Sequence, residues 1–147
     1  MKHTALYKIP IIYMIIYVLL IMLSGVWLFL LAQGLEGEES IIATLNHVII
    51  APTEKSIEGL IEVVTPHLFA IGTLIFVVAH FMLFSTKVSQ KFSLIVAMVL
   101  FMVAMFDIFS YFAISFGLVV SGWFKLLAMS AFIVLFLFML GLVGVSL

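Results

Sequence analysis

The chain contains no cysteine among its 147 residues. This absence excludes disulfide bonds, thiolate metal sites, iron–sulfur clusters and covalently attached c-type haem. Arginine is also absent, and the formal net charge is −1 at pH 7. The chain therefore offers no basic surface of the kind that binds nucleic acid, and a metal centre would need His, Met, Tyr or carboxylate ligands.

Charged residues are scarce at 9% of the chain, whereas hydrophobic residues make up 67% and the mean hydropathy is +1.46. A typical soluble domain is about half apolar and about a quarter charged, so this composition indicates a protein that faces lipid. The apolar residues form four blocks, each meeting the roughly 20 residues needed to cross a bilayer. These blocks are residues 10–31, 63–84, 92–119 and 123–145. The first is too long for the apolar part of a signal peptide, so we expect it to be a retained span.

The four blocks predict an all-α integral membrane four-helix bundle that forms a single transmembrane domain over residues 1–147. Lysines give its orientation, because cytoplasmic loops of membrane proteins are enriched in positive charge. Four of the six lysines flank one side of the spans, and six of the seven acidic residues lie in the one long loop on the other side. The four lysines are Lys2, Lys8, Lys87 and Lys91. We therefore predict that both termini are cytoplasmic and that the long loop is outside.

The long outer loop, residues 37–62, has a helical pattern of its own. Apolar residues recur at helical spacing from Ile41 to Ile49 and again from Ile57 to Val64. This periodicity predicts two short amphipathic helices that lie in the outer interface or cap the bundle. Thr65 and Pro66 then have the order of an N-cap followed by the first helical residue, so a new helix is expected to begin there.

Two histidines lie near the ends of the second span. His67 and His80 are 13 residues apart, which on a straight helix is about 20 Å along the axis and about 140° around it. Ionisable side chains inside a membrane helix are costly and point to a function. The axial distance suits two b-type haems, although haems held between the same two helices favour a spacing of about 14 residues. A kink near Gly72 could correct the angle, the histidines could use different partners, or only one could bind haem.

Candidate partners for these histidines lie on matching sides of the membrane. His47 is in the outer loop and could approach His67, and His3 is in the N-terminal segment and could approach His80. Because pairs of histidines hold b-type haem, we predict His67 and His80 as metal ligands and include His47 and His3 among the cofactor-binding candidates. Each histidine also has a structural alternative, in which its ring only hydrogen-bonds to water or to a neighbouring group.

Asp107 is the one acidic residue within a span, in the outer half of the third block. A carboxylate at that depth must pair, lose its charge or face a polar cavity. One hypothesis is that it orients a ligating histidine or accepts a proton. The alternative is a structural aspartate that is hydrogen-bonded or paired with Lys125. The long Lys125 stem is expected to carry its ammonium group out to the interface.

The segments TPHLFAIGTLIFVVAHFMLF and IVAMVLFMVAMFDIFSYFAISFG are similar to parts of a group of small, mostly uncharacterised four-helix bacterial membrane proteins. The shared features are a His-Leu pair in the second span and an Asp-Ile pair followed by two aromatic residues in the third. They correspond here to His67, Leu68, Asp107, Ile108, Tyr111 and Phe112. The resemblance implies a multi-pass protein of the bacterial inner membrane. More distantly, the architecture resembles four-helix b-type cytochromes, which implies electron exchange with quinone or an extracytoplasmic redox partner.

The leading functional hypothesis is a haem-b-binding electron-transfer subunit of the membrane, with His67 and His80 as axial ligands. The alternative is a cofactor-free structural or accessory subunit, because the low charge and short loops suit a chain that packs in a homo-oligomer or a larger membrane complex. A third interpretation, permeation of protons or solutes along Asp107 and His80, has less support. No Gly or Pro interrupts paired spans in the way typical of transporter sites.

Overall fold

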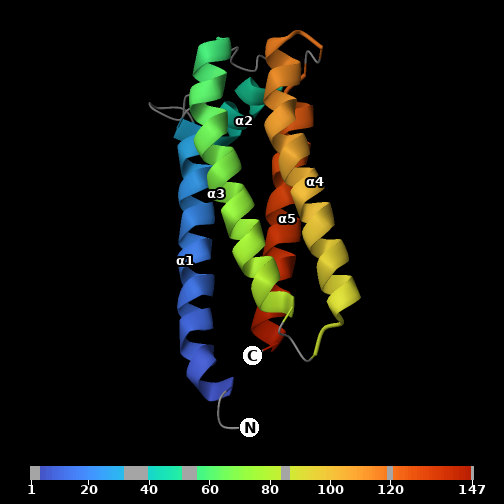
Figure 1. Ribbon diagram of the computed structural model, residues 1–147. Helices are drawn as coiled ribbons and strands as arrows, with labels where there is room; N and C mark the ends of the chain where they lie inside the picture. The colour runs from blue at the N-terminus through green and yellow to red at the C-terminus, as the bar shows by residue number, and fades with distance from the viewer. Residues whose placement is uncertain (1–3, 32–39, 51–55, 84–86, 119–120, 147) are drawn as a thin grey trace.

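The computed structural model describes residues 4–31, 40–50, 56–83, 87–118 and 121–146. The regular structure within these ranges is helical throughout. Its elements are α1 (Thr4–Leu30), α2 (Ile41–Ile50), α3 (Ile57–Leu83), α4 (Gln90–Ser115) and α5 (Trp123–Ser146). Figure 1 shows the four long helices running side by side, with the short α2 near one end of the bundle.

Each of the four long helices is long and apolar enough to cross a membrane. The four membrane-length segments are Lys8–Leu30, Ile57–Leu83, Gln90–Ser115 and Trp123–Ser146. The first residues of α1 and the last residues of α5 lie at the same end of the bundle, and α2 lies toward the opposite end (Figure 1). The assignment of these ends to the two sides of a membrane rests on the lysine distribution and stays a prediction.

The core of the bundle lies between α3, α4 and α5, which make the most extensive contacts with one another. Its fully buried members include Ile75 and Val78 of α3, Leu100 of α4, and Phe136 and Met139 of α5. By contrast, α1 packs on α5 and α2 and contributes Val18 to this core. The first helix is therefore held along a narrow strip, with most of its apolar surface directed outward.

The start of α3 differs from the sequence prediction. Instead of a short helix from Ile57 and a new one at Thr65, a single helix runs unbroken through Pro66. Ser56 begins this helix, because its hydroxyl accepts a hydrogen bond from the backbone N–H of Gly59 and its carbonyl accepts one from that of Leu60. The buried side chain of Leu60 then anchors the first turns to the bundle, and this packing outweighs the one backbone hydrogen bond that Pro66 cannot make.

The short helix α2 lies in the segment for which the sequence predicts the first amphipathic helix, and it packs closely on the bundle. Its location on the outer side of a membrane stays a prediction. Thr44 and Val48 are buried, and the backbone N–H of Gly122, just before α5, donates to the carbonyl of Ile49 at 3.2 Å. A Cβ atom added to Gly122 would overlap the backbone carbonyl of Val48. Glycine at this position therefore allows the end of α2 to approach the start of α5.

Replacing Gly122 with alanine should separate these two elements. We expect Gly122→Ala to lower the free energy of unfolding by about 1–3 kcal/mol, the usual cost of adding an atom to a tightly packed site. Thermal unfolding in detergent, together with hydrogen exchange of the α2 amides, measures this effect. Gly144→Ala is the matched control, since a Cβ at Gly144 meets nothing within 4 Å. Equal loss of stability in both variants would contradict the proposed contact.

Candidate functional site

The most distinctive polar feature of the bundle is an ion pair between α4 and α5. The ammonium nitrogen of Lys125 lies 2.7 Å from Oδ1 of Asp107, and the two residues are only 5% and 9% exposed. A buried pair of this kind must be well hydrogen-bonded, because removing two charges from water is costly. The site therefore depends on what else surrounds the two side chains.

Lys125 makes two further contacts through the same nitrogen. It donates to the backbone carbonyl of Asp107 at 3.0 Å, and it lies 4.3 Å from the centre of the Tyr111 ring. The hydroxyl of Ser110 also donates to the Asp107 carbonyl, at 2.6 Å. No buried side-chain nitrogen or oxygen in the described part of the chain lacks a hydrogen-bond partner. The pair is thus electrically neutral as a unit and satisfied by its own neighbours.

The inward position of Lys125 corrects the expectation that its ammonium group would extend to the interface. The residue lies on the face of α5 that packs into the bundle, together with Ala128 three residues later and Phe136 eleven residues later. This helical spacing is visible in the sequence and is the signal that could have placed Lys125 inside. Asp107 is thus paired with Lys125, and its predicted role in orienting a histidine or accepting a proton stays a prediction.

The three described histidines occupy separate, exposed positions. Nδ1 of His67 lies 2.9 Å from the carbonyl of Val63 on its own helix. The ring of His80 stacks on Phe76 with the ring centres 6.1 Å apart, and His47 is exposed on α2. His3 lies outside the described residues. Since His67 and His80 are about 20 Å apart along α3, they cannot bind the same metal ion.

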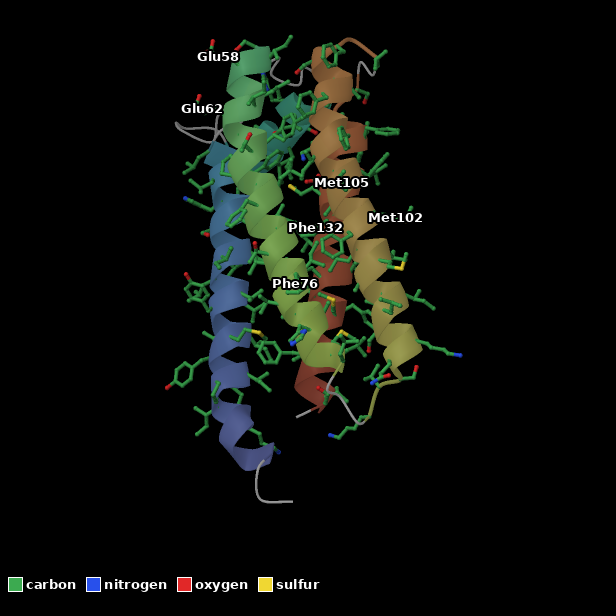
Figure 2. All side chains as sticks on the ribbon, viewed as in Figure 1. Glu58, Glu62, Phe76, Met102, Met105 and Phe132 are labelled. Carbon is green, nitrogen blue, oxygen red and sulfur yellow. The ribbon has the colours of Figure 1, made fainter. Side chains whose placement is uncertain are left out.

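No group of three or more His, Cys, Asp or Glu side chains among the described residues is arranged to hold a metal ion. The described acidic residues of α3, Glu58 and Glu62, lie at the end of the helix near α2 (Figure 2). Asp107 is bound to Lys125 in the neighbouring pair of helices. Within the described ranges, the structure therefore does not bring His47, His67, His80 and the carboxylates together into one cluster.

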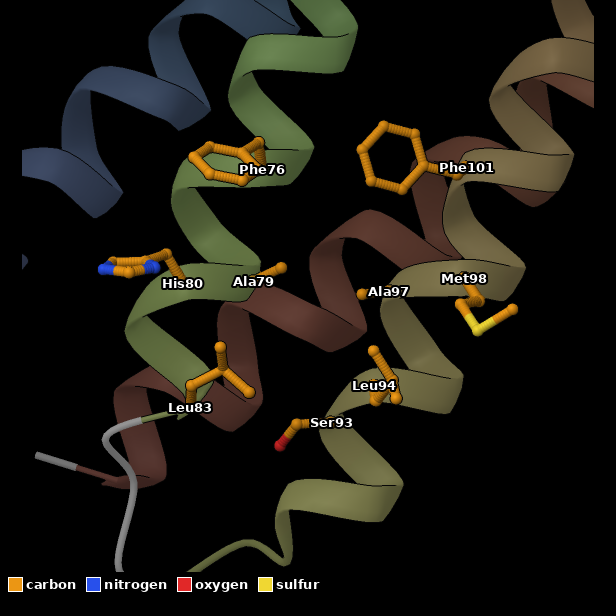
Figure 3. A pocket seen from close by; sticks show the side chains of 9 residues that line it. All are labelled: Phe76, Ala79, His80, Leu83, Ser93, Leu94, Ala97, Met98 and Phe101. Atoms are coloured by element: carbon orange, nitrogen blue, oxygen red, sulfur yellow. The ribbon is translucent and has the colours of Figure 1, made fainter.

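A groove of about 210 Å³ lies between α3 and α4, at the end of the bundle away from α2. Its nine lining residues are labelled in Figure 3, and only His80 and Ser93 among them carry a polar side chain. The groove is smaller than the pockets of about 300–1,000 Å³ that usually hold cofactors. Its shape and lining are suited to a narrow apolar group.

Comparison with known proteins gives one finding. A family model described as a transmembrane helical domain matches residues 37–147. These residues include α2 to α5 and leave α1 outside the match. No curated protein and no solved structure matches the chain.

The Asp107–Lys125 pair generates a prediction for a double-mutant cycle. Asp107→Leu or Lys125→Met alone should each lower the free energy of unfolding by about 3–5 kcal/mol, because each leaves the other charge buried without a partner. The double variant should recover most of that loss, since an apolar pair of similar size needs no partner. Equilibrium unfolding in mixed detergent micelles measures all three values. Losses that simply add in the double variant would contradict a direct interaction.

Proposed function

This chain belongs to the family of transmembrane helical domains, and we propose that it acts as a cofactor-free accessory subunit that pairs with a second copy through α1. The observation that carries this proposal is the outward face of α1. Within the described residues, the buried charges satisfy each other in the α4–α5 pair, whereas α1 directs most of its side chains away from the bundle. Lateral association in the membrane would cover that surface.

A regular row of exposed side chains follows the outer face of α1. The members of this row, called the α1 stripe, are Tyr13, Tyr17, Leu20, Ser24 and Trp27. Their separations alternate between four and three residues, which is the spacing of two helices that wrap around each other with a left-handed twist. Most helix pairs in membranes cross with this geometry, and small residues such as Ser24 allow the backbones to approach closely.

Tyr17 distinguishes the α1 stripe from an ordinary lipid-facing surface. Its side chain is 66% exposed, and it lies two residues from the middle of the segment Lys8–Leu30, about 3 Å along the axis. Tyrosines in membrane proteins favour the interface, because no water in the hydrocarbon core can bond to the hydroxyl group. A hydroxyl at this depth therefore favours a polar partner supplied by a neighbouring helix.

A second copy of the chain supplies such a partner by symmetry. Two copies inserted in the same direction place their α1 helices parallel, so that Tyr17 of each lies at the same depth. A two-fold axis brings identical residues together, and a phenolic hydroxyl can both donate and accept a hydrogen bond. The two Tyr17 hydroxyls would then hydrogen-bond to each other. One turn nearer the interface, Tyr13 of one copy would lie next to Tyr13 of the other.

Haem-b electron transfer, with exchange of electrons with quinone or an extracytoplasmic partner, is the second candidate function. One observation favours it: His67 and His80 are both exposed on α3, so each imidazole is accessible from outside the bundle. A haem held by His80 would have to lie against a second chain, because the groove beside His80 is smaller than usual cofactor pockets. The accessory role also involves a second chain, but it requires no cofactor-sized pocket.

Cysteine cross-linking tests the proposed pairing cleanly, because the natural chain contains no cysteine. We expect Leu20→Cys and Ser24→Cys to form disulfide-linked dimers when membranes containing the protein are oxidised. Met102→Cys is the control, since Met102 is 71% exposed near the middle of α4, on the opposite side of the bundle from α1 (Figure 1). Denaturing electrophoresis without reductant separates dimers from single chains.

Replacing Tyr17 with phenylalanine in the Ser24→Cys background should weaken the cross-link several-fold, because only the hydroxyl is lost. Two results would contradict pairing through α1. One is equal cross-linking at Leu20 and Met102, which would indicate random collision. The other is no cross-linking at either α1 position, which would indicate that the α1 stripe contacts lipid or a different protein.

A further inference from the structure

We propose that the groove between α3 and α4 holds one acyl chain of an anionic phospholipid whose phosphate group is bound at Lys91. This inference is independent of pairing through α1, because the groove lies between two other helices. It rests on the shape of the groove, on its position within two membrane-length helices and on the charge at its open end.

The groove exists because small side chains face each other across α3 and α4. Figure 3 shows Ala79 and Ala97 between the two helices, with Phe76 and Phe101 toward the middle of the bundle. The two phenylalanines line that end. From Leu94 to Phe101 the groove follows seven residues of α4, which is about 10 Å. This length accommodates part of an extended hydrocarbon chain.

The size of the groove selects its occupant. An α-helix with its side chains is about 10–12 Å across, which is too wide for a hollow of about 210 Å³. Only two of the lining residues have polar side chains, so water in the groove would have few hydrogen-bond partners. Both flanking helices are apolar and of membrane length, and the hydrocarbon available at that position is a lipid chain.

The open end of the groove is positively charged. Lys91 is exposed and lies seven residues before Met98, about 20° around the helix from it, at the edge of the face of α4 that lines the groove. Its long, flexible side chain can carry the ammonium group to the mouth. Lys87 precedes α4 and donates to the backbone carbonyl of Val145 at 2.6 Å. The acidic residues that the structure describes are in the first turns of α3 and in the second half of α4, away from this end. A phosphate group at the mouth would therefore meet cations and no described carboxylate.

The apolar groove and the lysine at its mouth together indicate the chemistry of the ligand. An acyl chain fills the apolar hollow, and a phosphate with a net negative charge lies next to Lys91. A zwitterionic phospholipid offers the same chain but no net charge, so it should bind more weakly. Anionic headgroups attract lysines close to the membrane surface through this net charge.

Native mass spectrometry of the full chain tests this proposal directly. The protein is delipidated in detergent and then given equal amounts of phosphatidylglycerol and phosphatidylcholine with identical acyl chains. We expect about fivefold more bound phosphatidylglycerol, the size of effect that one lysine has near an anionic headgroup. Lys91→Gln should reduce this ratio to near one. Lys8→Gln, which removes an exposed lysine from α1 at the same end of the bundle, should leave it unchanged.

A second variant tests the chain-binding part separately. Ala79→Leu fills the groove from α3 and should reduce the binding of both lipids several-fold. Equal binding of the two lipids by the natural chain would overturn the proposal. Equal effects of Lys91→Gln and Lys8→Gln would also overturn it, since they would indicate attraction to general surface charge. Undiminished binding of both lipids to Ala79→Leu would place the acyl chain elsewhere and overturn the assignment to this groove.

Discussion

The ion pair between Asp107 and Lys125 is the interaction on which the bundle depends. Two charges in a lipid-facing chain are tolerable only if they meet, and they meet between α4 and α5 at 2.7 Å. Lys125 lies in the first turn of α5, three residues after the glycine that contacts the end of α2. The pair therefore fixes α4 against α5 at the same end at which α2 packs. The Tyr111 ring lies against the Lys125 ammonium group, and the Ser110 hydroxyl donates to the backbone carbonyl of Asp107.

Much of this fold could be predicted from the sequence, because long apolar runs leave few alternatives to membrane helices. The prediction failed at Thr65 and Pro66, where a favourable local start signal competed with Ser56 and with the packing of Leu60. The contact of α2 with Gly122 was also not predictable, since it joins segments more than 70 residues apart in the sequence. Local signals describe the ends of helices, but tertiary packing decides which signal is used.

The candidate site was harder to predict than the fold for a related reason. Counting histidines says how many ligands a chain has, whereas ligation requires that two of them face each other. The rotation of each helix determines this, and in α3 the buried face belongs to Ile75, Val78 and Met82, which leaves His67 and His80 on exposed surface. Asp107 and Lys125 were recognisable individually. Their pairing follows from the position of Lys125 on the buried face of α5.

The buried charges of this bundle pair with each other, whereas the proposed binding surfaces are on α1 and in the α3–α4 groove. A reduced-minus-oxidised optical spectrum of the full chain, purified from haem-competent cells, tests most directly whether it acts without a redox cofactor. We expect no b-type absorption bands and no haem by pyridine haemochrome assay. Sharp b-type bands with stoichiometric haem, lost in His67→Ala or His80→Ala while the protein still inserts in the membrane, would contradict the accessory role and establish a cytochrome.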